Sequence, residues 1–161
     1  MEIRDRLVRA LDGARDHVID QVSTMSRAEL YRSQVPSNWS PLGLIRHLTL
    51  SDERYWFEVV VAGGPLDFWP PEPNGDWIVP AGTEPDQVID DYRRAAANSN
   101  RIIAATALSA PPKRPEPEWS ETGRFGDLLS ILVHNIVETS THAGQLDVAR
   151  ELADRGQHLV L

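Results

Sequence analysis

The sequence contains no cysteine among its 161 residues. This absence excludes disulfide bonds, cysteine nucleophiles and every metal site built on thiolate ligands. A metal ion in this protein would therefore be held by histidine and carboxylate side chains. Any thiol chemistry would need a thiol that a small molecule supplies.

Positive charge is in the minority, with 16 Lys and Arg against 24 Asp and Glu and a formal net charge of −8. A negative field repels phosphate backbones and anionic lipid surfaces, so we expect neither nucleic acid nor a membrane as a partner. The chain has no apolar run of about 18 residues, the length that a membrane span needs. Its first residues, MEIRDRLVRALDGARDHV, are charged and amphipathic, unlike a signal or transit peptide. We therefore expect a cytoplasmic protein.

Signals for β-strands are also scarce, because WIVP at 77–80 is too short to build a sheet and no alternating segment pairs with another. Apolar residues instead recur at spacings of three and four, which is typical of amphipathic helices. Four segments show this pattern, at roughly residues 3–23, 40–62, 83–108 and 124–154. The sequence therefore predicts an all-α fold, a four-helix bundle in a single domain over residues 1–161.

Two of the connections, 64–82 and 109–123, are long and rich in proline. The first contains Phe68 and two tryptophans, which a fully solvated linker would not need. We expect it to pack over one end of the bundle or onto a partner. Trp69, Trp77 and Trp119 are either anchors of a homodimer interface or rings that cover their own bundle.

The segment VETSTHAGQL, residues 137–146, places Glu138 and His142 one helical turn apart. That spacing lets a carboxylate and an imidazole converge on one metal ion. The pair belongs to a narrow stripe whose ends are apolar: Ile131, Asn135, Glu138, His142, Leu146 and Ala149. In a helix seam the two polar groups would be costly unless something compensated them, and metal coordination does so. The other interpretation is a solvated surface pair, because a second apolar row (Leu129, Leu132, Val133, Ile136) would put Glu138 at the edge of the bundle.

A third ligand would have to come from His17, His47, His134 or His158. His158 lies in the tail, and His17 stands among charged residues typical of a surface. His134 is two turns from His142, a long reach around one ion, and is either a ligand or a flanking group. His47 lies on the second predicted helix and is the best partner across helices, unless it is simply a histidine at the edge of the core.

Two segments carry a resemblance to a known family: SNWSPLGLIRHLTLSDERYWFE (37–58) and LLSILVHNIVETSTHAGQLDVARELAD (128–154). They resemble the DinB-like family, and within it the actinobacterial branch related to mycothiol-dependent maleylpyruvate isomerase and other thiol S-transferases. The matching residues are Trp39, Ser40, Pro41, His47, His142, Gly144 and Gln145. Much of the family has a histidine four residues before the last ligand, whereas the thiol-transferase branch has glutamate there, as this chain does at Glu138.

The resemblance implies a four-helix bundle in which His47, Glu138 and His142 bind one divalent ion, zinc in the first place and nickel in the second. Two histidines and one carboxylate leave a coordination position open, as in catalytic zinc sites. The resemblance further implies a low-molecular-weight thiol, such as mycothiol or bacillithiol, that attacks a small electrophilic substrate. His134 would transfer protons and Gln145 would orient a bound group, although both also fit ordinary packing roles. Relatives of this kind are often homodimers.

Three other hypotheses remain open at this point. The same ligand set also describes non-haem iron. A metal-dependent hydrolase would use a bound water in place of the thiol. A bundle that binds a metal or a small molecule in a stress response, without turnover, would need no reaction at all.

Overall fold

The computed structural model describes residues 2–116 and 123–154. Its helices are α1 (Ile3–Ser23), α2 (Arg27–Tyr31), α3 (Pro41–His47), η1 (Leu48–Val61), η2 (Gly75–Trp77), α4 (Pro85–Ala105) and α5 (Leu128–Asp154). These described ranges contain no β-strand. The predicted all-α bundle is confirmed, and its four helices correspond to α1, α3 with η1, α4 and α5. The short α2 was not predicted, although Ser26 and Glu29 form a capping box at its start.

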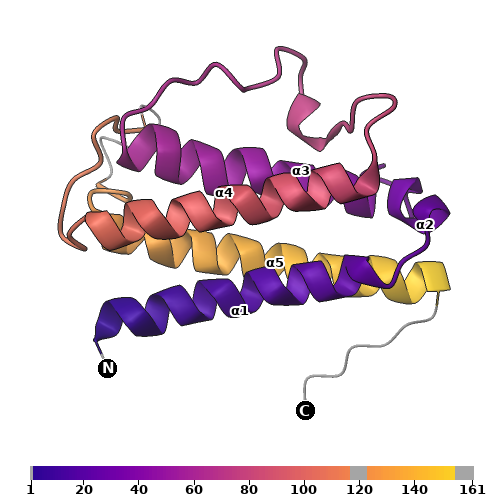
Figure 1. The fold of residues 1–161 in the computed structure, drawn as a ribbon, viewed down its shortest axis with the longest axis horizontal. Helices are drawn as coiled ribbons and strands as arrows, with labels where there is room; N and C mark the ends of the chain where they lie inside the picture. The colour runs from indigo at the N-terminus through magenta and orange to yellow at the C-terminus, as the bar shows by residue number, and fades with distance from the viewer. Residues whose placement is uncertain (1, 117–122, 155–161) are drawn as a thin grey trace.

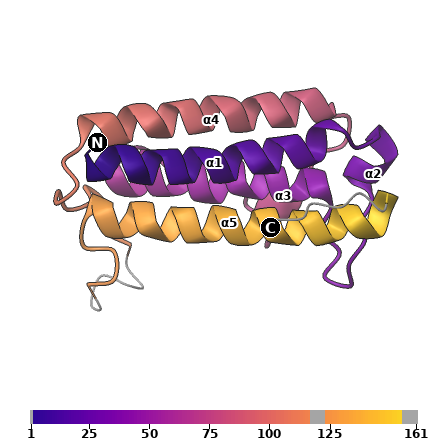
Figure 2. The same ribbon diagram turned by 90° about the horizontal axis from the view of Figure 1, so that it is seen from below.

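The four long helices do not simply alternate in direction. Figures 1 and 2 show α1 and α5 running one way and η1 and α4 running the other. Because η1 and α4 are parallel, the chain between them has to return along the length of the bundle. This explains the long 64–82 connection, which passes along one side of the bundle rather than over one end (Figure 1). None of the described helices is both long enough and apolar enough to cross a membrane.

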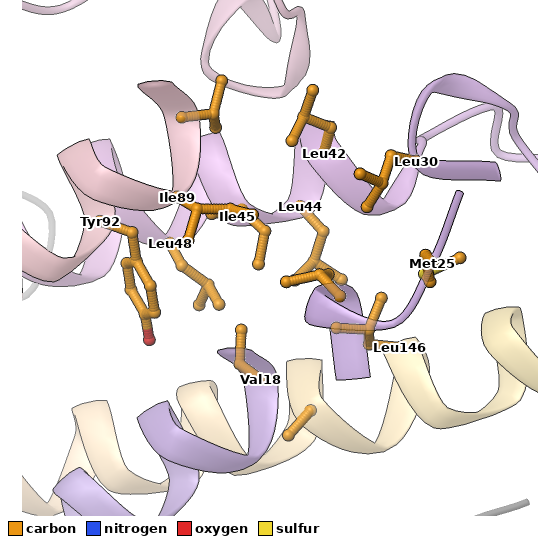
Figure 3. Packing of buried hydrophobic residues seen from close by; sticks show 13 residues of the cluster. Val18, Met25, Leu30, Leu42, Leu44, Ile45, Leu48, Ile89, Tyr92 and Leu146 are labelled. Carbon is orange, nitrogen blue, oxygen red and sulfur yellow. The ribbon is translucent and has the colours of Figure 1, made fainter. Parts of the chain in front are cut away.

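The apolar core consists of two clusters. One contains Leu44, Leu48, Tyr92 and Leu146 (Figure 3), and the other contains Leu11, Phe57, Ile103 and Leu132. On every long helix, buried polar residues stand in sequence between the members of the two clusters. These polar residues are Arg15, Asp52, Glu53, Ser99, Asn135 and Thr139. The bundle is therefore apolar toward both ends and polar in the middle.

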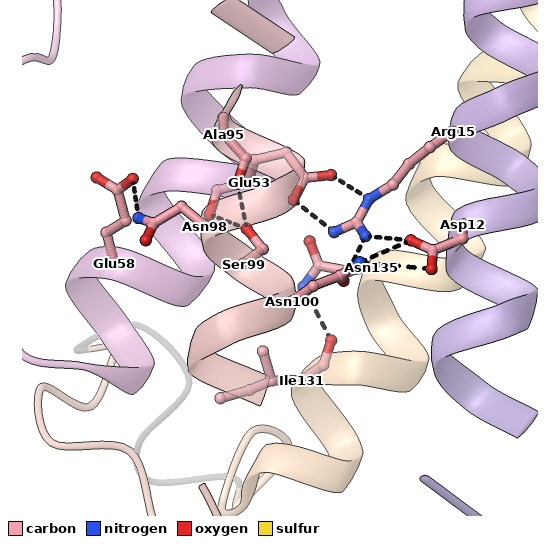
Figure 4. A network of polar contacts seen from close by, with 10 residues as sticks. All are labelled: Asp12, Arg15, Glu53, Glu58, Ala95, Asn98, Ser99, Asn100, Ile131 and Asn135. Atoms are coloured by element: carbon pink, nitrogen blue, oxygen red, sulfur yellow. Dashed lines mark hydrogen bonds and ion pairs between the residues drawn. The ribbon is translucent and has the colours of Figure 1, made fainter. Parts of the chain in front are cut away.

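An ion pair holds this polar layer together. Arg15 donates from Nε to Glu53 Oε1 at 2.7 Å and from Nη2 to Glu53 Oε2 at 2.6 Å, and both residues are buried (Figure 4). Its Nη1 donates to Asp12 and to Asn100, both at 2.8 Å. Burial acts to lower the pKa of Arg15, but the charge and hydrogen bonds of Glu53 outweigh it and raise that pKa. The pair joins α1 to η1 through the interior.

Candidate metal centre

His47 is the last residue of α3, and the start of that helix is well defined. The Ser40 hydroxyl accepts a hydrogen bond from the Gly43 N–H at 3.0 Å, and Pro41 occupies the first turn. After His47 the helix continues as η1 with the wider π-helical turn. Wide turns of this kind are frequent at functional sites.

The long crossover brings a second set of groups to His47. Asn74 adopts a left-handed backbone conformation, with φ of 57°, and starts the short turn Gly75–Trp77. The Nδ1 atom of His47 lies 2.6 Å from the Oδ2 atom of Asp76, and the His47 ring stacks on Trp77 with 4.0 Å between ring centroids. A Cβ atom at Gly43 would lie 2.4 Å from the Trp77 carbonyl oxygen, so only glycine lets the turn approach the helix this closely.

His142 on α5 completes a pair of imidazoles across the bundle. Its ring meets the His47 ring edge-on, with 5.0 Å between centroids, and it is buried. Its Nδ1 lies 2.9 Å from the side-chain oxygen of Gln145. Since carboxylate and amide oxygens accept hydrogen bonds, both rings donate from Nδ1 and keep the Nε2 lone pair available. This is the arrangement that orients metal-binding histidines in proteins.

Glu138 lies one turn before His142 and remains at the edge of the site. Its side chain is 41% exposed, and its Oε1 lies 3.9 Å from Nδ1 of His134. In the described part of the chain no three His, Asp or Glu side chains are gathered closely enough to hold an ion as they stand. The rest of the predicted stripe is buried, at Ile131, Asn135, His142, Leu146 and Ala149. Glu138 is thus the member of the predicted triad whose side chain would have to turn inward.

A pocket of about 540 Å³ opens beside His47 and Glu138. Its walls are aromatic at Tyr55, Trp56 and Trp69, and acidic at Asp52, Glu116 and Glu138. No lysine or arginine is among its described lining residues. Asp52 Oδ2 and Glu116 Oε2 are buried and accept no hydrogen bond from the described residues. Two orphaned carboxylate oxygens beside a pair of oriented imidazoles fit a bound cation.

A model of the mycothiol-S-transferase family matches residues 6–155. The chain belongs to this family. The match confirms the resemblance to the thiol-transferase branch of DinB-like proteins, and the family name indicates a transferase activity that involves mycothiol. A search of the curated proteins found no match.

The electrostatics of this family member favour a cation in the pocket. Burial lowers the pKa of His47 below its usual value, and the nearby His142 lowers it further, although Asp76 and Glu138 oppose the shift. Burial also lowers the pKa of His134. Both rings are therefore neutral near pH 7, the form in which imidazole binds a metal or takes up a proton. Burial, then the charges of Glu53 and Glu138, raise the pKa of Asp52 well above its ordinary value.

The cost of burying Asp52 predicts that Asp52→Asn stabilises the metal-free protein. A carboxyl group whose pKa is raised on folding contributes stability only below its unfolded pKa and loses it as the pH rises. At pH 8 the free energy of unfolding of Asp52→Asn should therefore be higher than that of the wild type. The difference should be larger than about 0.5 kcal/mol, the usual limit for a surface substitution. The difference should shrink as the pH falls toward 4. Urea unfolding across this range measures it, with Asp90→Asn on the surface of α4 as the control. A variant less stable than the wild type at pH 8 would contradict this account of Asp52.

The remaining predicted residues have different surroundings. His134 lines the pocket and meets Trp56 and Phe125 at ring-centroid distances of 4.9 Å and 4.8 Å. His17 was expected at the surface among charges, but it is half-buried and bonds Asp147 at 2.8 Å between α1 and α5. It is not among the residues that line the pocket beside His47. His158 and Trp119 fall outside the described residues.

Sequence reasoning missed Asp52, Asp76 and part of the role of the crossover. The motif NGDW at 74–77 was the available signal, because Asn-Gly starts a tight turn that can present the next side chains. Trp77 covers His47, and Trp69 meets Tyr55 with 5.8 Å between centroids. Both rings thus contact their own bundle. The homodimer and the cytoplasmic location stay predictions.

Proposed function

We propose that this family member is a metal-dependent S-transferase that joins a mycothiol-type thiol to a small electrophilic substrate. The observation that carries the proposal is the His47–His142 pair, in which both Nδ1 atoms are engaged and the His47 ring lines an acidic pocket. His47, His142 and, after a turn of its side chain, Glu138 would hold the ion. Two imidazoles and a carboxylate suit Zn²⁺ best, with Ni²⁺ as the second choice. When bound, such an ion lowers the pKa of a thiol or water near it.

The chain's own residues supply positioning and proton transfer. With no cysteine in the sequence, the sulfur nucleophile belongs to the cosubstrate. The aromatic walls formed by Tyr55, Trp56 and Trp69 would hold the apolar part of the electrophile. A new carbon–sulfur bond forms as the thiol loses its proton and the electrophile either accepts the electron pair or releases its leaving group. His134 borders the pocket, and its lowered pKa keeps the ring neutral near pH 7, the form in which it can accept that proton.

Asp76 and Gln145 have a positioning role in this proposal. Each accepts the Nδ1 proton of one histidine and thereby fixes both the tautomer and the rotation of the ring. The predicted role of Gln145 as a residue that orients a bound group is thus assigned to the ring of His142 rather than to the substrate. Trp77 limits water access to His47 by stacking on its ring.

A thiol-transfer assay with metal-stripped and zinc-loaded protein tests the function. We expect mycothiol to be consumed with monobromobimane or chlorodinitrobenzene faster in the presence of the zinc-loaded protein than with the stripped protein. His134→Gln should lower kcat by about 100-fold, the lower range for a general base, while the protein retains its metal. Bacillithiol and free cysteine in parallel reactions show which thiol is preferred.

The assay also separates the rival functions. Metal binding without faster consumption of any thiol would favour the non-catalytic binding protein. Ester or amide cleavage that depends on the metal and not on the thiol would favour a hydrolase. Activity restored by Fe²⁺ and not by Zn²⁺ would favour the non-haem iron hypothesis.

A further inference from the structure

A second pocket, of about 460 Å³, lies where α3 and η1 face α4 and the crossover. It shares no lining residue with the histidine pocket. Four of its residues recur at every fourth position along one helix face: Arg46, Leu50, Arg54 and Glu58. The neighbouring face of the same helix carries His47, so one helix separates two pockets of different composition. The volume lies within the range of small-molecule sites.

The charge of this second pocket is opposite to that of the histidine pocket. Its lining contains three arginines and two acidic residues, which leaves a net charge of +1 in a chain whose net charge is −8. Arg54 pairs with Glu58 at 3.1 Å, and Arg94 pairs with Asp91. Positive charge collected in a concave site of an acidic protein marks a place for an anion.

Among the three arginines of this pocket, Arg46 is the one that pairs with no carboxylate of the described residues. The structure gives its guanidinium one hydrogen bond, a long one of 3.5 Å from Nε to the Gly75 carbonyl oxygen. Within the described residues its two terminal NH₂ groups therefore retain their donors. A half-buried guanidinium with unused donors is costly unless solvent or a ligand meets them.

The rest of the pocket adds an apolar surface and a fixed second cation. Leu50 and Val88 are buried and line the pocket, and Phe68 of the crossover joins them. The Arg54 guanidinium lies over the Phe68 ring, with its Cζ atom 3.7 Å from the ring centroid. A guanidinium stacked on an aromatic face has its plane fixed, with its N–H groups pointing outward from the stack.

We propose that this pocket binds a small organic monoanion, a carboxylate attached to a short apolar body. The carboxylate bonds to Arg46 with Arg54 beside it, and the apolar body lies against Leu50, Val88 and Phe68. Guanidinium groups match planar carboxylates through two parallel hydrogen bonds. One net positive charge balances a monoanion and leaves a polyanion unbalanced. This site is separate from the candidate metal centre and does not depend on the proposed transferase reaction.

Benzoate is the probe, and benzyl alcohol is the neutral molecule of matched shape. Saturation-transfer NMR on the full-length protein should show benzoate bound, with benzyl alcohol at least about tenfold weaker, since the charge-assisted bonds are lost. Arg46→Gln should lower the affinity for benzoate by a similar factor. Arg94→Gln, at a side chain that is 68% exposed, should weaken it several-fold without any effect on folding. The matched control is Arg93→Gln, because Arg93 forms the same kind of pair with Asp90 but lies outside the pocket.

A His142→Ala background separates this site from the metal centre. Benzoate binding that persists there and disappears with Arg46→Gln supports the proposal, whatever the outcome of the transferase assay. Three results would overturn it: equal affinities for benzoate and benzyl alcohol, unchanged benzoate affinity in both Arg46→Gln and Arg94→Gln, or loss of benzoate binding in His142→Ala. Inorganic phosphate can be tested by its ability to displace benzoate. A higher affinity for phosphate than for benzoate would also overturn the assignment to a monocarboxylate.

Discussion

Replacing Glu53 by glutamine is expected to lower the free energy of unfolding by about 3–5 kcal/mol, the usual cost of breaking a buried ion pair from one side. Glutamine has nearly the same shape, so the loss reflects charge rather than a cavity. The Arg15 guanidinium would stay buried, and the glutamine amide, with its single acceptor oxygen, could keep at most one of the two hydrogen bonds that Glu53 accepts. Among the described residues, the partly exposed Asp12 would then be the remaining ion-pair partner of Arg15. Chemical denaturation at neutral pH measures the change. The midpoint temperature of thermal unfolding should fall by roughly 10 °C for a chain of this size.

Two further variants serve as controls for the effect of Glu53→Gln. Asp90→Asn breaks an exposed pair on α4, and should cost no more than about 1 kcal/mol. The double substitution Arg15→Met with Glu53→Leu removes both charges, and should recover much of the stability lost in Glu53→Gln. If Glu53→Gln costs less than about 1 kcal/mol, the pair is not the main contact of the polar layer.

His142→Ala is expected to abolish the retention of a divalent ion by the purified protein. The substitution removes one of the two oriented imidazoles and leaves a single histidine with a carboxylate. The affinity for Zn²⁺ should fall by more than the roughly 100-fold that loss of an outer hydrogen-bonding partner can reach. Elemental analysis should give about one equivalent of metal for the wild type and close to none for the variant, and a competition titration with a chelating dye gives the affinities.

Graded substitutions distinguish ligands from their supports. Gln145→Ala should lower the affinity for Zn²⁺ by only about 10–100-fold, because it removes a hydrogen bond that orients the His142 ring and leaves every ligand in place. Glu138→Gln should weaken it as well if the side chain turns inward to the ion. His17→Ala, at a histidine that bonds Asp147 and does not line the pocket, should leave the metal content unchanged. A His142→Ala protein that keeps its helical circular dichroism spectrum and its full metal content would refute the candidate centre.

The helices were predictable because burial and periodicity act locally. The apolar spacing of three and four along residues 3–23 identified α1 with the same bounds that the structure has. The segment predicted from residue 40 begins where α3 begins for a local reason, since the Ser40 cap and the Pro41 ring act within one turn. The parallel pairing of η1 and α4 was not predictable in this way. It depends on how four amphipathic faces are shared, and no single segment contains that information.

The same distinction applies to the site. Glu138 and His142 were recognisable together because one helical turn relates them. His47 was expected as their partner from its helix and from the resemblance, and the structure brings its ring against that of His142. Asp76 was not expected, since it lies 29 residues beyond His47 and approaches it only through the fold of the crossover. Asp52 looked like an ordinary polar position of an amphipathic helix, and only the burial of its carboxylate revealed its cost.

In the crossover from η1 to α4, the residues that shape the pockets are largely distinct from those that hold the fold together. The parallel helices fix how far this segment must reach, but most of its residues contribute nothing to the two core clusters. Yet it brings Asp76 and Trp77 against the ring of His47, Trp69 to the histidine pocket and Phe68 to the second pocket. Substitutions within the crossover can therefore alter which ligands each pocket binds with little effect on the stability of the bundle. This holds as long as Gly43 leaves room for the turn at Gly75–Trp77.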